Sequence, residues 1–244
     1  MASLPLVLYG CVAQPVSIER DAPRGHIVAR PGRPGFVVAA PHGTTDPQTG
    51  DVAAELARRT GFGLVVAAGF AIDPDAPGRP GRRYQVNRPF EGVPGRPPGE
   101  DVPSEAARQV YLTYEKRVEE AAQGRLTFYA EIHGNGRRES AGRIEVATVG
   151  VDPEFAERLR TLFELIRDAH LRGHPSAPRL EMVIEPADKI FYAATGAKRD
   201  GILRAPARAL HLELPRVARV DAREPYLTIL SEFLREAATL PAGR

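Results

Sequence analysis

Apolar runs alternate with helical patterns along most of the chain, and this alternation limits the fold more than any other feature of the sequence. Apolar or alternating runs predict strands at residues 4–9, 35–40, 63–68, 126–132, 142–149, 180–184 and 209–214. Apolar spacing of three and four predicts helices at residues 49–60, 104–122, 152–171 and 222–238. Such alternation predicts a sheet covered on both faces. We therefore expect an α/β fold, a single three-layer α/β/α domain with a mixed central sheet across residues 1–244.

Length and charge narrow the classes of protein that fit. The chain has 244 residues, which suits one sizeable domain and is short for two. Lys and Arg total 33 against 31 for Asp and Glu, and this balance argues against a nucleic-acid partner. No apolar run approaches the roughly 18 residues of a membrane helix. We expect neither a nucleic-acid nor a membrane partner, and the oligomeric state stays open.

Cys11 is the one cysteine of the sequence, so no internal disulfide can form. The sequence therefore shows no sign of an oxidising compartment, and we expect a cytoplasmic location. Residues 8–11 loosely resemble a bacterial lipoprotein cleavage site, which would anchor the chain at Cys11. Residues 1–10 contain no Lys or Arg and only a very short apolar run, so a first strand at residues 4–9 is the preferred interpretation.

Residues 73–103 are rich in Pro, Gly and Arg and show little periodicity. We expect a long loop here without regular structure. Loops of this length inside a compact domain are uncommon, and they are usually functional or mobile.

Polar residues occur where apolar strands are expected to end. His42 follows the run at residues 35–40, and His133 ends the run at 126–132. Either histidine alone could merely cap a strand or pack in the core. Strand ends are rigid enough to fix metal ligands, and a catalytic zinc takes three protein ligands and leaves its fourth position to water. We therefore expect one zinc per chain.

Asp46 is the natural carboxylate partner of His42, because a short loop lets both side chains reach one ion. Two neutral imidazoles and one carboxylate would leave a net charge of +1 to acidify a bound water. The alternative is that Asp46, just before Pro47, is a turn residue.

Glu213 lies in the apolar run at residues 209–214. Alternation places it on the same face as His211 and on the face opposite Leu210 and Leu212. A Glu in an edge strand often just points to water, so this position alone assigns no role to the side chain.

Five stretches resemble, in order, motifs of the zinc carboxypeptidase-like superfamily, nearest to N-formylglutamate amidohydrolase and the aspartoacylase/succinylglutamate desuccinylase branch. They are PHGTTD at 41–46, QVNRPF at 85–90, YAEIHG at 129–134, the weaker IFYAATG at 190–196, and LHLELP at 210–215. Two departures matter: Asp46 stands four residues after His42, where the family commonly has Glu at three, and Gln85 stands where Asp is common. The resemblance implies a phosphorylase/hydrolase-like fold and a metal-dependent amidohydrolase.

The resemblance also implies roles for individual residues. His42, Asp46 and His133 would bind the zinc, and Glu213 would be the general base that moves the proton of the attacking water. Arg88 would donate to the scissile carbonyl or to a substrate carboxylate.

Three further side chains are candidates for substrate binding. Asn87 would orient the substrate through its amide, and Tyr192 would contact it. Without the resemblance, a turn and a surface charge would be the preferred interpretation of Asn87 and Arg88. Arg143 belongs to a basic cluster after His133 that could recognise an anionic substrate, or could be a solvated charge cluster.

The expected partner is a small N-acyl amino acid or a short peptide. An N-acylated acidic amino acid, as in N-formylglutamate, is the first candidate, and a small closed pocket lined by Arg would favour it. The first alternative is a carboxypeptidase-like enzyme of the same fold that cuts a γ-glutamyl or cell-wall peptide. The second is a non-catalytic α/β binding protein in which the histidines only cap strands.

Overall fold

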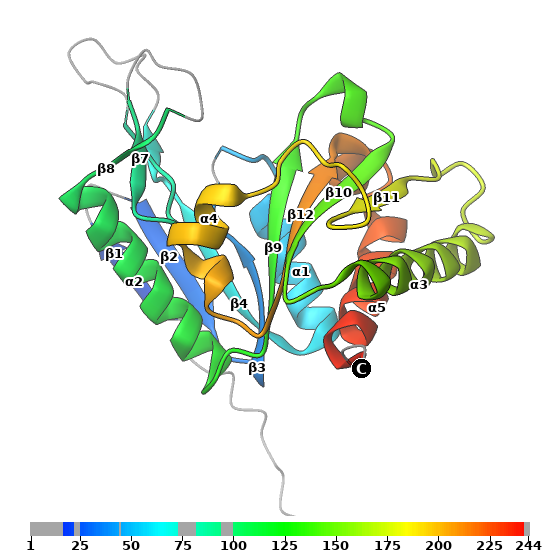
Figure 1. Ribbon diagram of the computed structural model, residues 1–244, viewed down its shortest axis with the longest axis horizontal. Helices are drawn as coiled ribbons and strands as arrows, with labels where there is room; N and C mark the ends of the chain where they lie inside the picture. Colours follow the sequence, from blue (N-terminus) through cyan, green and yellow to red (C-terminus); the bar gives the residue numbers. More distant parts are fainter. Residues whose placement is uncertain (1–16, 22–24, 44, 73–81, 94–99, 242–244) are drawn as a thin grey trace, which may run out of the picture.

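The computed structural model describes residues 17–21, 25–43, 45–72, 82–93 and 100–241, and it contains a mixed eight-stranded sheet (Figure 1). The strand order is β1-β2-β4-β3-β9-β12-β10-β11. The strands are β1 (Ser17–Asp21), β2 (Gly25–Arg30), β3 (Arg33–Ala40), β4 (Phe62–Ala68), β9 (Phe128–Asn135), β10 (Arg143–Val149), β11 (Glu181–Ile184) and β12 (Arg208–Pro215). The mixed central sheet is confirmed. The strand expected at residues 4–9 and the candidate anchor Cys11 lie outside the described residues.

The centre of the sheet is parallel. Strand β3 pairs in parallel with β4 and β9, and β9 pairs in parallel with β12. Strands β2 and β10 pair antiparallel on the two sides of this centre. The carboxyl ends of β3, β9 and β12 therefore meet at one edge, where open α/β sheets bind their ligands.

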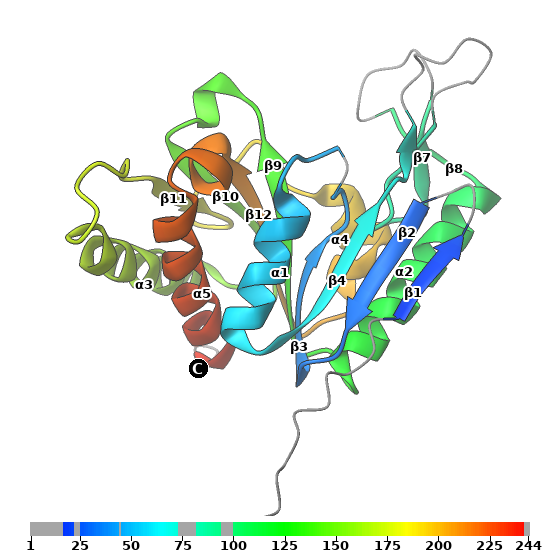
Figure 2. The same cartoon turned by 180° about the vertical axis from the view of Figure 1, so that it is seen from behind.

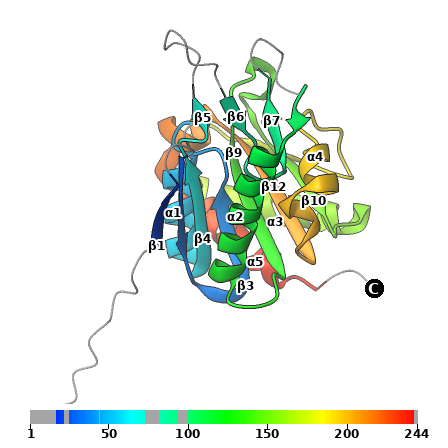
Figure 3. The same ribbon diagram turned by 90° about the vertical axis from the view of Figure 1, so that its left-hand side faces the viewer.

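Helices cover both faces of the sheet, as expected. One face is covered by helices α1 (Thr49–Thr60), α3 (Pro153–Leu171) and α5 (Arg223–Thr239). Figure 2 shows the molecule turned by 180° from Figure 1, with α1 and α5 in front of the sheet. Helices α2 (Glu105–Ala122) and α4 (Thr195–Asp200) pack on the other face, and α2 faces the viewer in Figure 3. Short helical turns are η1 (Arg138–Ser140), η2 (Ile202–Arg204) and the π-helical η3 (Val217–Asp221).

Successive side chains of a strand point to opposite faces of the sheet, and a hydrophobic core forms on each face. On β3, Val38 packs into the cluster with α1, α3 and α5, and its neighbour Val37 packs into the cluster with α2. Because both clusters share one sheet, we propose that residues 1–244 form one domain. Among the described residues, no helix has the length and apolar character needed to cross a membrane.

Local capping explains where two predicted helices begin. Ser104 Oγ accepts a hydrogen bond from the amide of Ala107 at 3.1 Å, and Asp152 Oδ1 accepts one from the amide of Phe155 at 2.7 Å. Each cap satisfies an amide that the first turn leaves without a partner. The helices at 104–122 and 152–171 are confirmed, with Ser104 and Asp152 as caps just outside them.

The prediction of a structureless loop at residues 73–103 was wrong for the described part of that segment. Residues on either side of its gaps form a second, four-stranded sheet: β5 (Ala71–Ile72), β6 (Arg82–Tyr84), β7 (Phe90–Gly92) and β8 (Val102–Pro103). Strands of two or three residues are too short to show an alternating pattern. This small sheet stands at the carboxyl edge of the large one (Figures 1 and 3), where Gln85 reaches His42.

Candidate active site

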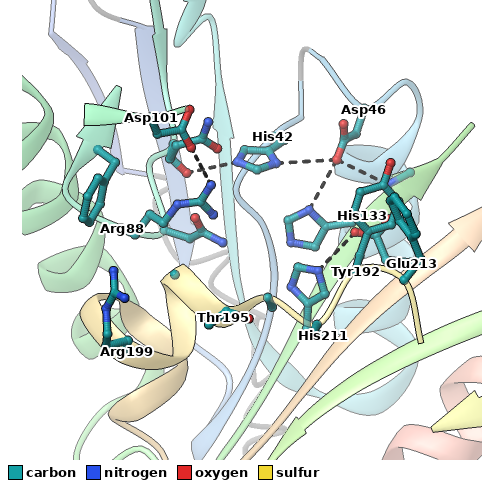
Figure 4. Close-up of a pocket in the computed structure, with 18 of the residues that line it drawn as sticks. His42, Asp46, Arg88, Asp101, His133, Tyr192, Thr195, Arg199, His211 and Glu213 are labelled. Atoms are coloured by element: carbon teal, nitrogen blue, oxygen red, sulfur yellow. Dashed lines mark hydrogen bonds and ion pairs between the residues drawn. The ribbon is translucent and has the colours of Figure 1, made fainter. Parts of the chain in front are cut away.

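The three residues expected to bind metal converge at the carboxyl edge of the sheet. The Nδ1 atom of His42 lies 3.6 Å from Asp46 Oδ2, and the Nδ1 atom of His133 lies 3.4 Å from the same oxygen (Figure 4). The candidate ligand atoms of the three residues all lie within 4.8 Å of one another. One detail differs from expectation: His133 lies inside β9 rather than at its end, because the strand continues to Asn135.

The second ring nitrogen of each histidine is held by an oxygen that can only accept. His42 Nε2 donates to the backbone carbonyl of Gln85 at 3.0 Å, and His133 Nε2 donates to Glu131 Oε2 at 3.2 Å. In the neutral imidazoles each Nδ1 therefore presents its lone pair toward Asp46. Metal-binding histidines are commonly oriented in this way, so the donor set fits a divalent metal.

The ionisation states of the three candidate ligands depend on one another. Burial by itself lowers the pKa of His133, but hydrogen bonds with Asp46 and Glu131 raise it to about 10. Burial by itself raises the pKa of Asp46, but hydrogen bonds with His133 and His42 hold it below its usual range. Burial lowers the pKa of His42. Asp46 is therefore ionised and stabilises a positively charged His133. A metal that binds His133 would displace the extra proton from this ring.

Glu213 lies beside this cluster without joining it. It stands opposite His133 in the pairing of β12 with β9, lines the cavity, and is only 7% exposed. Its Oε1 accepts a hydrogen bond from His211 Nε2 at 3.1 Å. His211 thus lies on the same side of β12 as Glu213, as the alternation predicts.

A cavity of about 570 Å³ opens over these residues. Among the described residues, three arginines line it, namely Arg83, Arg88 and Arg199, together with Asp101, Phe191 and Tyr192. Arg88 and Arg199 lie on the side of the cavity away from His133 and Glu213 (Figure 4). Arg88 Nη2 donates to Asp101 Oδ2 at 2.7 Å, which holds the guanidinium within the cavity wall. The volume suits a ligand larger than a single small amino acid.

A tight turn carries Asn87 and Arg88 to the cavity. Its central residue, Val86, has a φ of 58°, which is rare for a β-branched side chain, and the Asn87 amide donates to the Gln85 carbonyl at 2.6 Å. That carbonyl also holds His42. Such backbone strain occurs mainly where a site needs it.

The side-chain amide of Asn87 already makes one hydrogen bond within the protein. Its Nδ2 donates to Glu131 Oε2 at 3.2 Å, and its buried Oδ1 has no hydrogen-bond partner among the described residues. Asn87 also lines the cavity, and its Oδ1 keeps the capacity to accept a hydrogen bond.

Arg143 is not brought to the other candidates. Its Nη2 lies 2.9 Å from Glu145 Oε1, and it is not among the described residues that line the cavity. Glu145 is fully buried and needs a countercharge, which Arg143 supplies.

Several residues of the site were not predicted from the sequence. They are Glu131, Arg83, Asp101, Thr195 and Arg199. Glu131 did have a signal, because it stands two residues before His133 and so shares its face of β9, as His211 and Glu213 share a face of β12. The other four come from segments without a recognisable periodic pattern.

Comparison with known proteins supports the fold. No protein-family model matches the chain, and no curated protein matches its sequence. A gene product of Agrobacterium tumefaciens of known structure is similar at a TM-score of 0.50 and 16% identity, over 86% of this chain and 94% of that one. A bacteriophage poly-gamma-glutamate hydrolase is similar at 0.47 and 12%, over 90% of each chain. A metallo-carboxypeptidase from Burkholderia cenocepacia is similar at 0.44 and 11%, over 87% of this chain and 60% of that one.

At these identities the similarity shows the fold alone. The similarity to the Agrobacterium protein confirms the α/β fold that the sequence predicts.

Proposed function

We propose that this chain is a metal-dependent amidohydrolase, in which His42, Asp46 and His133 hold one zinc ion and Glu213 is the general base. One observation carries the proposal: two imidazole Nδ1 atoms converge on one carboxylate oxygen while a second carboxylate faces the same cavity. Three protein ligands with an open fourth position are typical of catalytic zinc.

The reaction follows from these positions. When bound, zinc supplies Lewis acidity to a carbonyl and lowers the pKa of water. Glu213 accepts a proton from the attacking water and later returns it to the departing amine. Arg88 donates to the carbonyl oxygen as negative charge develops, or to a substrate carboxylate. Tyr192, at the rim, contacts the bound substrate.

The lining of the cavity supports an anionic substrate. Arg83, Arg88 and Arg199 place three guanidinium groups in it, whereas the acids among its described lining residues are Asp46 and Glu213 at the candidate metal site and Asp101, which pairs with Arg88. Guanidinium groups pair with carboxylates through two parallel hydrogen bonds. An N-acylated acidic amino acid, such as N-formylglutamate, is therefore our first candidate.

A longer substrate is the second candidate, because the cavity is large and its rim is open. Phe191 and Tyr192 are 54% and 40% exposed at the rim, and Arg137 lies over the Phe191 ring at 3.4 Å. Exposed aromatic rings beside a cavity suit the further residues of a γ-glutamyl or cell-wall peptide. A cytoplasmic location belongs to the same proposal, since one cysteine allows no internal disulfide.

Hydrolysis of a defined panel tests the proposal. Zinc-loaded protein is given N-formylglutamate, N-acetylglutamate, γ-glutamyl peptides, a cell-wall peptide and N-formylleucine, and amine release is measured. We expect the acidic substrates to be cut at least about tenfold faster than N-formylleucine, which is ~1.4 kcal/mol. Activity should disappear on removal of metal with a chelator and return with zinc. A zinc-loaded protein that cuts none of them would instead support a non-catalytic binding protein.

A further inference from the structure

A fully buried carboxylate, Glu131, lies behind the candidate metal ligands. Its oxygens accept four hydrogen bonds: from His133 Nε2 at 3.2 Å, His211 Nδ1 at 3.0 Å, Asn87 Nδ2 at 3.2 Å and the Tyr129 hydroxyl at 3.0 Å. A carboxylate that is cut off from water needs such donors to stay ionised. Glu131 therefore joins strands β9 and β12 and the turn at Asn87 through one side chain.

Two imidazole rings depend on the same oxygen of Glu131. The rings of His133 and His211 are stacked, with centroids 4.0 Å apart, and both donate to Oε2. The other ring nitrogen of His133, Nδ1, faces Asp46, and the other ring nitrogen of His211, Nε2, is hydrogen-bonded to Glu213. One carboxylate thus sets the orientation of a candidate ligand and, through His211, of the candidate base.

The support of Glu131 continues into the core. The hydroxyl of Tyr129 also lies 2.8 Å from that of Tyr114 on α2, and both rings are fully buried. The carboxylate is therefore tied to packed elements and not to a loop. A site whose supporting side chains are locked in this way keeps its geometry better than one on mobile segments.

We propose that Glu131 is a positioning residue that fixes the separation between the zinc ligand His133 and the general base Glu213. This inference rests on the proposed function and deepens it. Glu131 touches neither the substrate nor the metal. It keeps the Nδ1 of His133 aimed at the ligand cluster, and it holds His211 where the ring can bind the Glu213 carboxylate.

A different role for Glu131 has to be weighed. Glu131, His133 and His211 also lie close enough together to bind an ion, which would make Glu131 a ligand of a second metal. Oε2, the oxygen that both histidines contact, already accepts hydrogen bonds from His133, His211 and Asn87, and Oε1 accepts one from Tyr129, so an ion bound at Oε2 would have to displace donors that are in place. The hydrogen-bonded arrangement is therefore favoured over a second ion.

The first test compares two fully buried glutamates of the large sheet. Glu131→Gln removes the carboxylate behind His133, and Glu145→Gln is the matched control, since Glu145 binds Ser140 and Arg143 but no histidine. Zinc affinity is measured by competition with a chelator. We expect Glu131→Gln to weaken zinc binding about 10–100-fold, the usual effect of losing such a partner. Glu145→Gln should bind zinc as the wild type does.

The second test examines the contact between His211 and the general base Glu213, and it does not require Glu131→Gln to fold. His211→Phe keeps a ring stacked on His133 but deletes both hydrogen bonds of His211. We expect it to retain one zinc, with kcat about 10–100-fold lower and KM unchanged. A loss of packing alone would not separate kcat from KM in this way.

Three results would overturn the inference. Wild-type zinc affinity and kcat in Glu131→Gln would remove its positioning role, and unchanged kcat in His211→Phe would remove the link to Glu213. Two metals in the wild type and one in Glu131→Gln would make Glu131 a ligand. A wild type that binds no zinc would refute the proposed function itself, and this inference with it.

Discussion

Among single residues, Glu213 is the one that moves the proton in the proposed reaction. Its neighbours Leu212 and Leu214 are fully buried on the other face of β12, so its carboxylate is directed into the cavity. Glu213→Gln keeps the shape and removes the basicity. We expect it to retain zinc and to lose at least about 10²-fold in kcat. Initial rates with parallel metal analysis check this. Loss of zinc would make Glu213 a ligand, and an unchanged rate would remove it from the mechanism.

A second single residue, Arg88, is expected to recognise the substrate. Arg88→Lys keeps the charge but loses the planar fork, so we expect kcat/KM on N-acyl glutamates to fall about 10–100-fold, or ~1.5–3 kcal/mol. Arg138→Lys is the matched control, because Arg138 is exposed and does not line the cavity among the described residues. Equal kcat/KM in the two variants would show that Arg88 is not part of the binding site.

At the scale of elements, the turn with Asn87 and Arg88 depends on the segment after α4. The amide of Ile202 donates to the Asn87 carbonyl at 2.9 Å, and a Cβ added at Gly201 would lie 2.1 Å from that oxygen. The φ of Gly201 is −126°, which any residue can adopt, so the close contact alone excludes a side chain.

Gly201→Ala should therefore displace the turn, at a cost of about 1–3 kcal/mol in the free energy of unfolding. Because Arg88 moves with it, KM should rise as well. Gly142→Ala is the matched control, since no described atom lies within 4 Å of a Cβ added there. Denaturant unfolding and steady-state kinetics measure both quantities. If Gly201→Ala matched Gly142→Ala in both, the turn would not depend on this contact.

Elements with a long local pattern could be predicted from the sequence, and short ones could not. The apolar spacing and the caps at Ser104 and Asp152 are local signals, so the four long helices were found within a residue or two of their bounds. Strands β5 to β8 and the six-residue α4 have too few residues to show a period.

The site divides in the same way between local and non-local information. Strand ends and alternation indicated His42, His133 and Glu213, because those signals lie in the runs themselves. Arg143 was a candidate only because its ion pair with the buried Glu145 cannot be read from the order of residues. The contribution of Arg199 depends on how α4 folds against the large sheet.

At the scale of the whole molecule, the order of the strands makes the site. Three parallel neighbours, β3, β9 and β12, bring residues from three distant stretches of the chain to one edge. Helices on both faces bury the rest of the sheet, so this edge is where polar side chains can gather without loss of core. The central claim is that they gather there around one metal ion.

Metal content tests that claim most directly. Zinc per chain is measured by elemental analysis in the wild type, in the His42→Ala/His133→Ala double variant, and in His170→Ala. His170 pairs with Glu232 at 2.6 Å and does not line the cavity, so it is the matched control. We predict one zinc per chain in the wild type and in His170→Ala, and none in the double variant. Equal zinc in the wild type and the double variant would contradict the account.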